Sequence, residues 1–319
     1  MRQTLLAAIA VLAAAIASTP RAAEAQNQRR GADYFPNLPV VTQDGKTLKF
    51  YDDVIKDKIV LISFIYTNCP DICPLTTARI AQLEDQLGDM VGRDIFFVSM
   101  TADPERDTPE RLKEFATAFD VGPGWLFLTG KPEDIRVINS KLGDRSRKLS
   151  DHRNEIVLGN DRTGEWARDT VLGDFNSLVR TIRDVDPKWR DQDHTSGVSN
   201  TGDTLLTLSQ QPGQAMFKKI CAPCHTVGVG DRVGPDLRGV TERRDRTWLS
   251  NFVRNPAKMR AQQDPVALAL AAKYPGVHMP TLGVSEIDAT DLITYLEAET
   301  SRLSDTPVAD HGHDRHHQH

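Results

Sequence analysis

The chain has 319 residues, of which 39% are hydrophobic and 26% are charged, and its net charge is −5. This composition is typical of a soluble globular protein with some polar linker, and the length favours two domains over one. A slightly acidic chain lacks the basic surface with which proteins bind nucleic acid, so we expect no nucleic-acid partner.

Residues 1–25 have the pattern of an export signal. Arg2 provides a positive start, residues 5–17 are almost entirely apolar, and Ala23-Glu24-Ala25 supplies a cleavage site. The apolar run is shorter than the ~20 residues that span a bilayer. We therefore expect cleavage near Gln26 and a periplasmic protein, which meets the membrane only through a partner or, in the alternative, through an uncleaved signal.

Residues 32–184 have the order of strands and helices of an α/β domain. Two buried strands, at 58–66 and 94–100, enclose a helix, which indicates a parallel pair with a crossover. Further elements are expected as a helix at 108–119, a strand at 125–128, a helix at 132–142, strands at 155–158 and 166–172 and a helix at 175–182. Parallel strands followed by a terminal hairpin predict a thioredoxin-like fold.

The rest of the chain divides into three parts. Residues 185–211 are rich in Asp, Ser, Thr, Gly and Gln, which is typical of a linker. Residues 212–302 predict a small all-α domain, with helices near 214–220, 247–254 and 288–299. The polar tail, 303–319, holds His311, His313, His316, His317 and His319. Such a tract captures copper, nickel or zinc, or is a tail without a role.

A haem-attachment pattern lies at the start of the all-α domain, where Cys221-Ala222-Pro223-Cys224-His225 matches C-x-x-C-H. Two thiols three positions apart bond the two vinyl groups of a haem, and the next residue places an imidazole beneath the iron. The pattern predicts one covalent haem c, held by Cys221 and Cys224 with His225 as an iron ligand.

This stretch resembles the class I cytochrome c family in the order of its motifs, over somewhat more than a quarter of the chain. The resemblance implies His225 as the proximal ligand and Met279 as the distal ligand, which favours electron transfer because both axial positions are filled. Ordinary core packing is the alternative for Met279, and His278 is the competing ligand. Tyr295 is expected to pack near Phe217, as the terminal helices of that family do.

A second cysteine pair lies in the sequence Cys69-Pro70-Asp71-Ile72-Cys73-Pro74, between a buried strand and a helix. At this separation the two sulfurs either close a disulfide or bind one metal ion together. A helix N-terminus beneath them lowers the thiol pKa and favours the thiolate, which is both the metal ligand and the reactive form. Paired cysteines of exported proteins are normally structural disulfides, so that interpretation is the alternative.

The N-terminal domain resembles the copper-delivery family of Sco and SenC proteins, which serve cytochrome c oxidase. The matching segments cover nearly half of the chain and are TNCPDICP at 67–74, DPERDTPE at 103–110, LTG at 128–130 and Asp151-His152. The resemblance implies Cys69, Cys73 and His152 as copper ligands. Two thiolates and an imidazole suit both Cu(I) and Cu(II).

Other residues near these motifs qualify the resemblance. Residues 153–155 are polar or charged where the family usually continues apolar, so solvent access or partner choice is expected to differ. Asp103 and Asp107 either orient the copper ligands without contacting the metal themselves or cap a helix at the surface.

Together the two halves predict an exported copper-binding redox protein. We expect a copper chaperone for assembly of the cytochrome c oxidase copper centre, with a fused monohaem electron-transfer domain. Its expected partner is the copper-bearing subunit of the oxidase or another periplasmic redox protein.

Two other interpretations stay open. In the first, the chain is a thiol:disulfide oxidoreductase that uses Cys69 and Cys73 as a redox couple and the haem as electron donor or acceptor. Copper and haem each exchange one electron whereas a dithiol exchanges two, which favours copper as the partner of the haem. In the second, the fusion only tethers a carrier to its oxidase.

Overall fold

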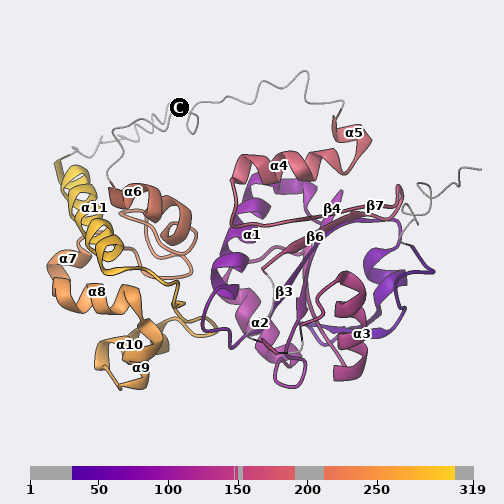
Figure 1. Cartoon of the computed structure of the whole chain (residues 1–319), viewed down its shortest axis with the longest axis horizontal. Coiled ribbons are helices and arrows are strands. Elements are labelled where there is room, and N and C mark those ends of the chain that lie inside the picture. Colours follow the sequence, from indigo (N-terminus) through magenta and orange to yellow (C-terminus); the bar gives the residue numbers. More distant parts are fainter. Residues whose placement is uncertain (1–30, 147, 150–153, 191–211, 306–319) are drawn as a thin grey trace, which may run out of the picture.

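The computed structural model describes residues 31–146, 148–149, 154–190 and 212–305, which form an N-terminal and a C-terminal domain (Figure 1). The expected export signal, the predicted copper ligand His152, residues 191–211 of the expected linker and most of the histidine-rich tail lie outside the described residues. Within the described part of the chain, no helix is long and apolar enough to cross a membrane.

The N-terminal domain is built on a seven-stranded mixed sheet with the strand order β2-β1-β5-β4-β3-β6-β7. The central strands β3, β4 and β5 are parallel, and the outer strands pair antiparallel. The strands are β1 (Pro39–Thr42), β2 (Thr47–Lys49), β3 (Ile59–Ile65), β4 (Ile95–Thr101), β5 (Trp125–Thr129), β6 (Ile156–Asn160) and β7 (Glu165–Asp169).

Strand β3 is buried along its whole length, and its side chains alternate between two apolar layers. Ile59, Leu61 and Ile65 face one layer, whereas Val60 and Ile62 face the other. Each fully buried aliphatic side chain of this kind stabilises the fold by about 1.5–3 kcal/mol. A buried central strand of this type places the loop that follows it, which begins at Tyr66, at the edge of a rigid sheet.

Helices cover both faces of the sheet, as Figure 1 shows. Helices α1 (Cys73–Leu87), α2 (Pro109–Ala118) and α4 (Phe175–Asp184) pack on one face. Helix α3 (Pro132–Leu142) and a short π-helical segment, Phe50–Ile55, pack on the other. A single 3₁₀ turn, Gly88–Met90, follows α1. The thioredoxin-like fold class is therefore confirmed.

The end of the N-terminal domain differs from the expectation in two places. Strand β7 ends at Asp169 rather than Leu172, because the Asp169 side chain accepts a hydrogen bond from the N–H of Thr170 and the Thr170 side chain accepts one from the N–H of Leu172. After residue 184 the chain continues to pack on this domain: Val185 is buried, and a short helix α5 (Pro187–Arg190) follows it. The polar composition of this region hid these anchoring residues.

The C-terminal domain is all helical, as expected, with a small core of its own that consists of Phe217, Leu292, Tyr295 and Leu296. The rings of Phe217 and Tyr295 lie 5.4 Å apart. A Cβ atom on Gly213 would meet the carbonyl oxygen of Asp291 at 2.2 Å, so the first and last helices cross too closely for any side chain there. The helices are α6 (Pro212–Met216), a π-helical continuation Phe217–Cys221, α7 (Val240–Arg243), α8 (Arg246–Arg254), α9 (Pro256–Ala261), α10 (Pro265–Lys273) and α11 (Glu286–Asp305).

Helix α11 is longer at both ends than the sequence pattern indicated. Its start is set by Ser285 and Asp288, whose side chains exchange hydrogen bonds with each other's backbone N–H groups. This reciprocal pair is a capping box. The signal was present in the sequence as Ser-x-x-Asp.

Candidate functional site

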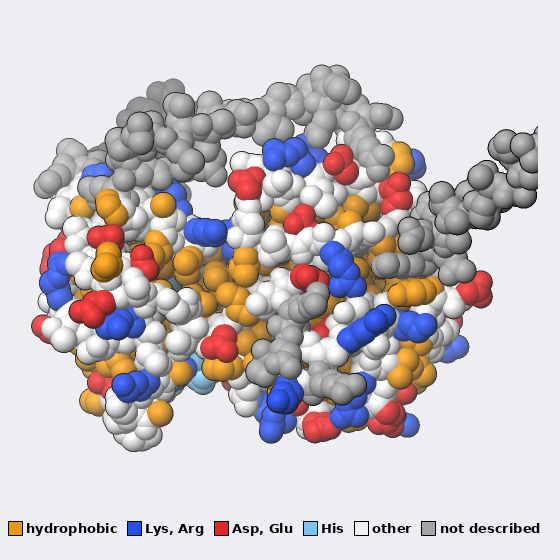
Figure 2. Space-filling view, in the orientation of Figure 1, with side chains coloured by type: hydrophobic (Ala, Val, Ile, Leu, Met, Phe, Trp, Pro, Cys, Tyr) orange, Lys and Arg blue, Asp and Glu red, His pale blue; other side chains and the backbone are white. Residues whose placement is uncertain are grey.

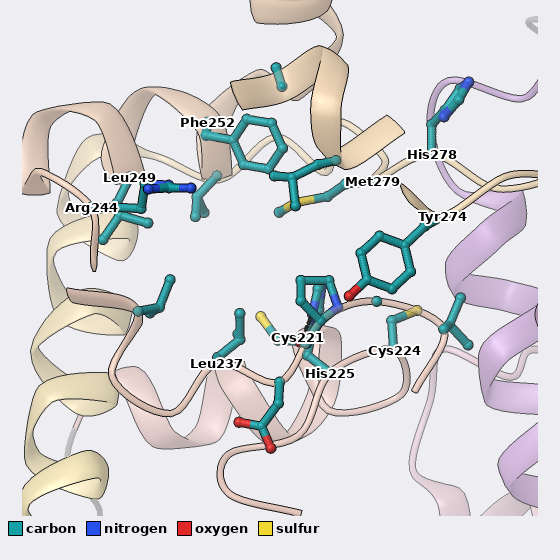
Figure 3. A pocket seen from close by; sticks show the side chains of 18 of the residues that line it. Cys221, Cys224, His225, Leu237, Arg244, Leu249, Phe252, Tyr274, His278 and Met279 are labelled. Atoms are coloured by element: carbon teal, nitrogen blue, oxygen red, sulfur yellow. Dashed lines mark hydrogen bonds between the residues drawn. The ribbon is translucent and has the colours of Figure 1, made fainter. Parts of the chain in front are cut away.

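A cavity of about 370 Å³ is lined by the C-terminal domain and by Pro74 of the N-terminal domain, and the predicted haem residues surround it (Figure 3). Cys221, Cys224 and His225 form one side, and Met279 lies across the cavity from His225. His278 lines the rim, but Figure 3 shows its ring directed away from the cavity. The structure therefore brings all four predicted residues together and favours Met279 over His278 as the side chain that reaches the centre.

The orientation of the His225 ring is set by two neighbours in the following loop. Its Nδ1 lies 2.9 Å from the carbonyl oxygen of Pro235. Since a carbonyl only accepts, Nδ1 carries the proton and the lone pair of Nε2 is free for a metal. A Cβ atom on Gly234 would meet the ring at 2.5 Å, so this glycine leaves room for the imidazole. Burial lowers the pKa of His225, which keeps the imidazole neutral.

The walls of the cavity combine apolar side chains with arginines. Leu249 and Phe252 line it, and Figure 3 shows them along one wall. Arg244 and Arg260 are also at the wall, and Arg260 donates a 3.4 Å hydrogen bond to the carbonyl oxygen of Met279. A haem needs an apolar slot for its ring and cations for its two carboxylates, so the residues present fit this group.

The second site lies where β3 passes into α1. Cys69 and Cys73 are both free thiols in the structure, with 7% and 1% of their surface exposed. The backbone N–H of Cys73, at the first residue of α1, lies 3.3 Å from the Cys69 sulfur and donates to it. This is the arrangement in which a helix N-terminus stabilises a thiolate.

The two thiols are electrostatically unequal. A hydrogen bond from the Cys73 thiol, opposed by burial, lowers the pKa of Cys69 to about 6. Donating that bond and lying buried both raise the pKa of Cys73. In the haem cavity neither thiol has a lowered pKa, because burial raises the pKa of Cys221 and of Cys224 to about 12 each. The first pair thus contains a thiolate near neutral pH, whereas the second pair does not.

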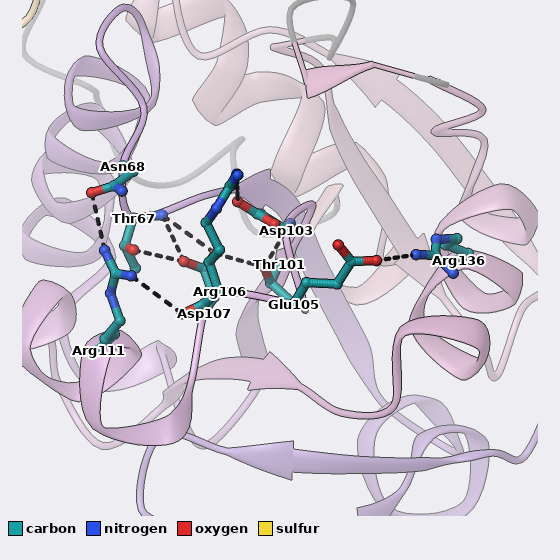
Figure 4. Close-up of polar contacts among 9 residues, drawn as sticks. All are labelled: Thr67, Asn68, Thr101, Asp103, Glu105, Arg106, Asp107, Arg111 and Arg136. Carbon is teal, nitrogen blue, oxygen red and sulfur yellow. Dashed lines mark hydrogen bonds and ion pairs between the residues drawn. The ribbon is translucent and has the colours of Figure 1, made fainter.

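The loop that carries Cys69 is held by a buried carboxylate from another part of the chain (Figure 4). Asp107 is 1% exposed and accepts hydrogen bonds from the hydroxyl groups of Thr67 and Thr101, both at 2.6 Å, and from the backbone N–H of Thr67. Burial raises the pKa of Asp107, and these hydrogen bonds oppose the shift. Asp107 therefore orients the dithiol loop.

Helix capping, the other role considered for the two acids, belongs to a different residue. The Thr108 side chain accepts the hydrogen bond from Arg111 N–H at the start of α2. Asp103 is 7% exposed and pairs with Arg106 at 3.1 Å. Neither Asp103 nor Asp107 is a surface cap.

We expect Asp107→Asn to destabilise the N-terminal domain by about 1–3 kcal/mol. The amide N–H₂ group would face donors of Thr67 and Thr101 whose hydrogen bonds the carboxylate accepts in the wild type, and those bonds would be lost. The measurement is urea unfolding of the full chain followed by circular dichroism. Asp94→Asn is the matched control, since Asp94 is partly exposed and pairs only with its neighbour Arg93. Equal midpoints for the two variants contradict the role of Asp107.

The third predicted copper ligand, His152, lies outside the described residues. Among the residues that the structure does describe, no group of three His, Cys, Asp or Glu side chains is arranged as a metal site. The structure thus places two of the three predicted ligands, Cys69 and Cys73, beside each other.

Sequence reasoning did not identify several residues that shape the two sites. Gly234 and Pro235 were recognised only as part of a loop, although the GPDL pattern itself begins nine residues after His225 of the haem motif. Arg79, on α1, is buried and donates hydrogen bonds to the carbonyl oxygens of Val171 and Gly173, at 2.6 and 3.1 Å. Nothing in the local sequence marks this arginine as buried.

Comparison with known proteins gives separate matches for the two halves of the chain. A profile of the SCO1/SenC family matches residues 26–158, and a cytochrome c profile matches residues 210–299. The SCO1 protein homolog of Bacillus subtilis is 38% identical over 144 residues, which cover 44% of this chain and 73% of that protein. A SCO2-like protein of Rickettsia conorii is 34% identical over 116 residues, which cover 36% of this chain and 52% of that protein.

Solved structures match the N-terminal half. A crystal structure of Arabidopsis thaliana ScoI with copper bound is 25% identical, with a TM-score of 0.41, and the match covers 50% of this chain and 99% of that chain. The chain spans about half the length of several curated relatives that it matches, for example 51% of one from Stutzerimonas stutzeri. Since its match to the Bacillus subtilis homologue covers 73% of that protein at 38% identity, the chain belongs to the SCO1/SenC family, and it carries a cytochrome c domain at its C-terminal side.

Proposed function

We propose that the chain is an exported copper-binding protein that delivers copper for assembly of the copper centre of cytochrome c oxidase. The observation that carries the proposal is the dithiol at the N-terminus of α1, in which Cys69 has a pKa of about 6 and Asp107 holds the loop. Thiolate sulfur is the preferred ligand of Cu(I).

The proposed copper ligands are Cys69, Cys73 and His152. Copper is the cargo of the site, and two thiolates with one imidazole hold both of its oxidation states. Because Cys73 is buried as a neutral thiol, binding copper releases its proton, which makes loading dependent on pH. The proposed acceptor is the copper-bearing subunit of the oxidase or another periplasmic redox protein.

The proposed cofactor of the C-terminal domain is one haem c, attached to Cys221 and Cys224. When bound, it supplies one-electron exchange at a potential that its axial ligands set. Pro235 holds the His225 ring with Nε2 free, and Met279 reaches the opposite side of the cavity. The arginines of the wall, Arg244 and Arg260, are placed to bind carboxylates.

Residues 1–25 are proposed as a cleaved export signal, so the protein acts in the periplasm. This location fits the cofactor, since the first 25 residues have an export pattern and the chain carries a cytochrome c domain.

A specific observation also favours the thiol:disulfide oxidoreductase alternative. A thiol with a lowered pKa, Cys69, next to a thiol with a raised pKa, Cys73, is the arrangement of a nucleophilic and a resolving cysteine. Oxidation of the Cys69 thiolate and the Cys73 thiol to a disulfide releases two electrons and one proton. A single haem accepts one electron at a time, so two turnovers of the haem are needed for each disulfide.

The two functions differ in what reaches the acceptor. We expect the Cu(I)-loaded chain to transfer one copper per molecule to the metal-free, reduced copper-bearing domain of the oxidase, and a Cys73→Ser chain to transfer none. Copper in each protein is measured after separation of the two. If no copper moves, and the metal-free reduced chain instead reduces a disulfide in the same acceptor, the oxidoreductase function replaces the chaperone function.

A further inference from the structure

One short segment of the cytochrome domain lies against the dithiol loop. The backbone N–H of Thr281 donates a 2.9 Å hydrogen bond to the carbonyl oxygen of Pro70, which lies between the two cysteines. Val277 is 9% exposed and belongs to the apolar cluster of the sheet domain that also includes Cys69 and Cys73. Figure 2 shows hydrophobic side chains gathered where the two domains meet. The contact therefore has a polar and an apolar component.

The haem cavity and the dithiol loop share a wall at this contact. Pro74, the residue next to Cys73, lines the haem cavity. From the other side, Cys224 packs against the apolar cluster of the sheet domain. Since Met279 lies between Val277 and Thr281 in the sequence, one stretch of backbone presents Met279 to the cavity, Val277 to the apolar cluster of the sheet domain and Thr281 to the dithiol loop.

Two basic residues add contacts between the domains. Arg79 is buried on α1, and besides its two bonds within the N-terminal domain it donates a 3.5 Å bond to the carbonyl oxygen of Lys219. At the surface, Arg232 pairs with Asp85 of α1 at 3.2 Å. An exposed ion pair such as Arg232–Asp85 contributes little to the free energy of folding, so its role is to set the orientation of the docked domain.

A glycine marks how closely the two domains approach. Gly276 has φ +82°, and a Cβ atom there would meet the carbonyl oxygen of Glu114, on α2, at 2.8 Å. Gly283, seven residues further along the chain, has φ +67°, and a Cβ atom there would have no other atom within 4 Å. The two glycines thus share their backbone conformation but differ in whether they face the other domain.

We propose that residues 276–281 are a docking element that seats the cytochrome domain on the loop from Cys69 to Pro74. In this closed arrangement the chain's own cytochrome domain shields the dithiol, and an acceptor reaches Cys69 and Cys73 only after that domain moves away. The covalent connection keeps the cytochrome domain at high effective concentration near the loop, so the closed arrangement re-forms after each exchange. The inference rests on the proposed function only for the identity of the cargo.

The test measures access to the thiols in the reduced, metal-free full chain. Asn tolerates positive φ, so the Gly276→Asn side chain would clash with Glu114 of α2 and push the two domains apart at little cost in local backbone strain. Gly283→Asn is its matched control. Alkylation of Cys69 and Cys73 is followed by mass spectrometry of the digested protein. We expect Gly276→Asn to raise the rate by about tenfold, as local opening equilibria of this size allow, and Gly283→Asn to change it by less than about twofold.

The haem spectrum of each variant reports whether the cytochrome domain has kept its fold. If Gly276→Asn leaves the alkylation rate unchanged with an intact haem spectrum, or if both variants raise it equally, the docking proposal is overturned.

A charge exchange decides the question if Gly276→Asn does not fold. Asp85→Arg places two positive charges opposite each other, and adding Arg232→Asp restores an opposite pair. We expect faster alkylation in the single variant and a return toward the wild-type rate in the double variant; equal rates in all three chains argue against docking. Copper stoichiometry is measured separately. If the wild-type chain binds no copper but its thiols are alkylated slowly and Gly276→Asn speeds the alkylation, the proposed function is refuted while the docking element stands.

Discussion

Replacing Cys221 and Cys224 together by Ala is expected to abolish covalent haem and to unfold the cytochrome domain. Without a haem the cavity of about 370 Å³ is left in a small domain whose own buried cluster has only four residues. The free energy of folding of so small a domain is low, and an empty cavity of this volume lowers it further. Acid-acetone extraction checks the attachment, and circular dichroism of the helices checks the fold. Wild-type protein is expected to retain its haem in the protein fraction after extraction.

Single substitutions at the iron ligands separate attachment from ligation. Met279→Ala is expected to keep the covalent haem and to lose the near-infrared sulfur-to-iron charge-transfer band of the ferric protein. His278→Ala is the matched control, because its ring points away from the cavity, and it is expected to keep the band. A band that survives in Met279→Ala assigns the distal position to another residue.

Replacing Cys69 or Cys73 by Ser is expected to remove the single tight copper of the N-terminal domain. Loss of a thiolate ligand costs more than the ~10–100-fold in affinity that loss of an outer hydrogen-bond partner typically costs. The chain for this experiment carries Asn in place of the five tail histidines, so that metal capture by a histidine tract cannot contribute to the stoichiometry. Metal analysis after dialysis against a weak copper chelator gives the stoichiometry.

Asn68→Ser serves as the control for copper binding. Asn68 precedes Cys69 in the sequence, and its side chain accepts a hydrogen bond from Arg111 at the surface, so its variant is expected to keep one copper per chain. His152→Ala is expected to weaken binding as the cysteine variants do. One copper in the Cys69→Ser/Cys73→Ser double variant would falsify the site.

The central strands and the two cysteine motifs were predictable because each is a contiguous pattern. Strand β3 is a run of seven buried residues, and the haem motif places two thiols and an imidazole within five positions. The hairpin of β1 and β2 was not predicted, since its strands have only four and three residues and alternate weakly. Helices α7 and α9 were also missed, because they are too short to show a helical period. Helix α10 is as long as the predicted α8, but its sequence PVALALAAK is almost entirely apolar and shows no amphipathic period.

The sequence alone therefore determined which chemistry the chain carries, through residues that are neighbours along the backbone. Only the tertiary structure decided how that chemistry is positioned. Thr67 and Asp107 are 40 residues apart, and Pro70 and Thr281 are separated by more than 200, yet each pair is joined by hydrogen bonds. A local pattern carries no record of such partners, because burial of distant segments in a common core brings them together.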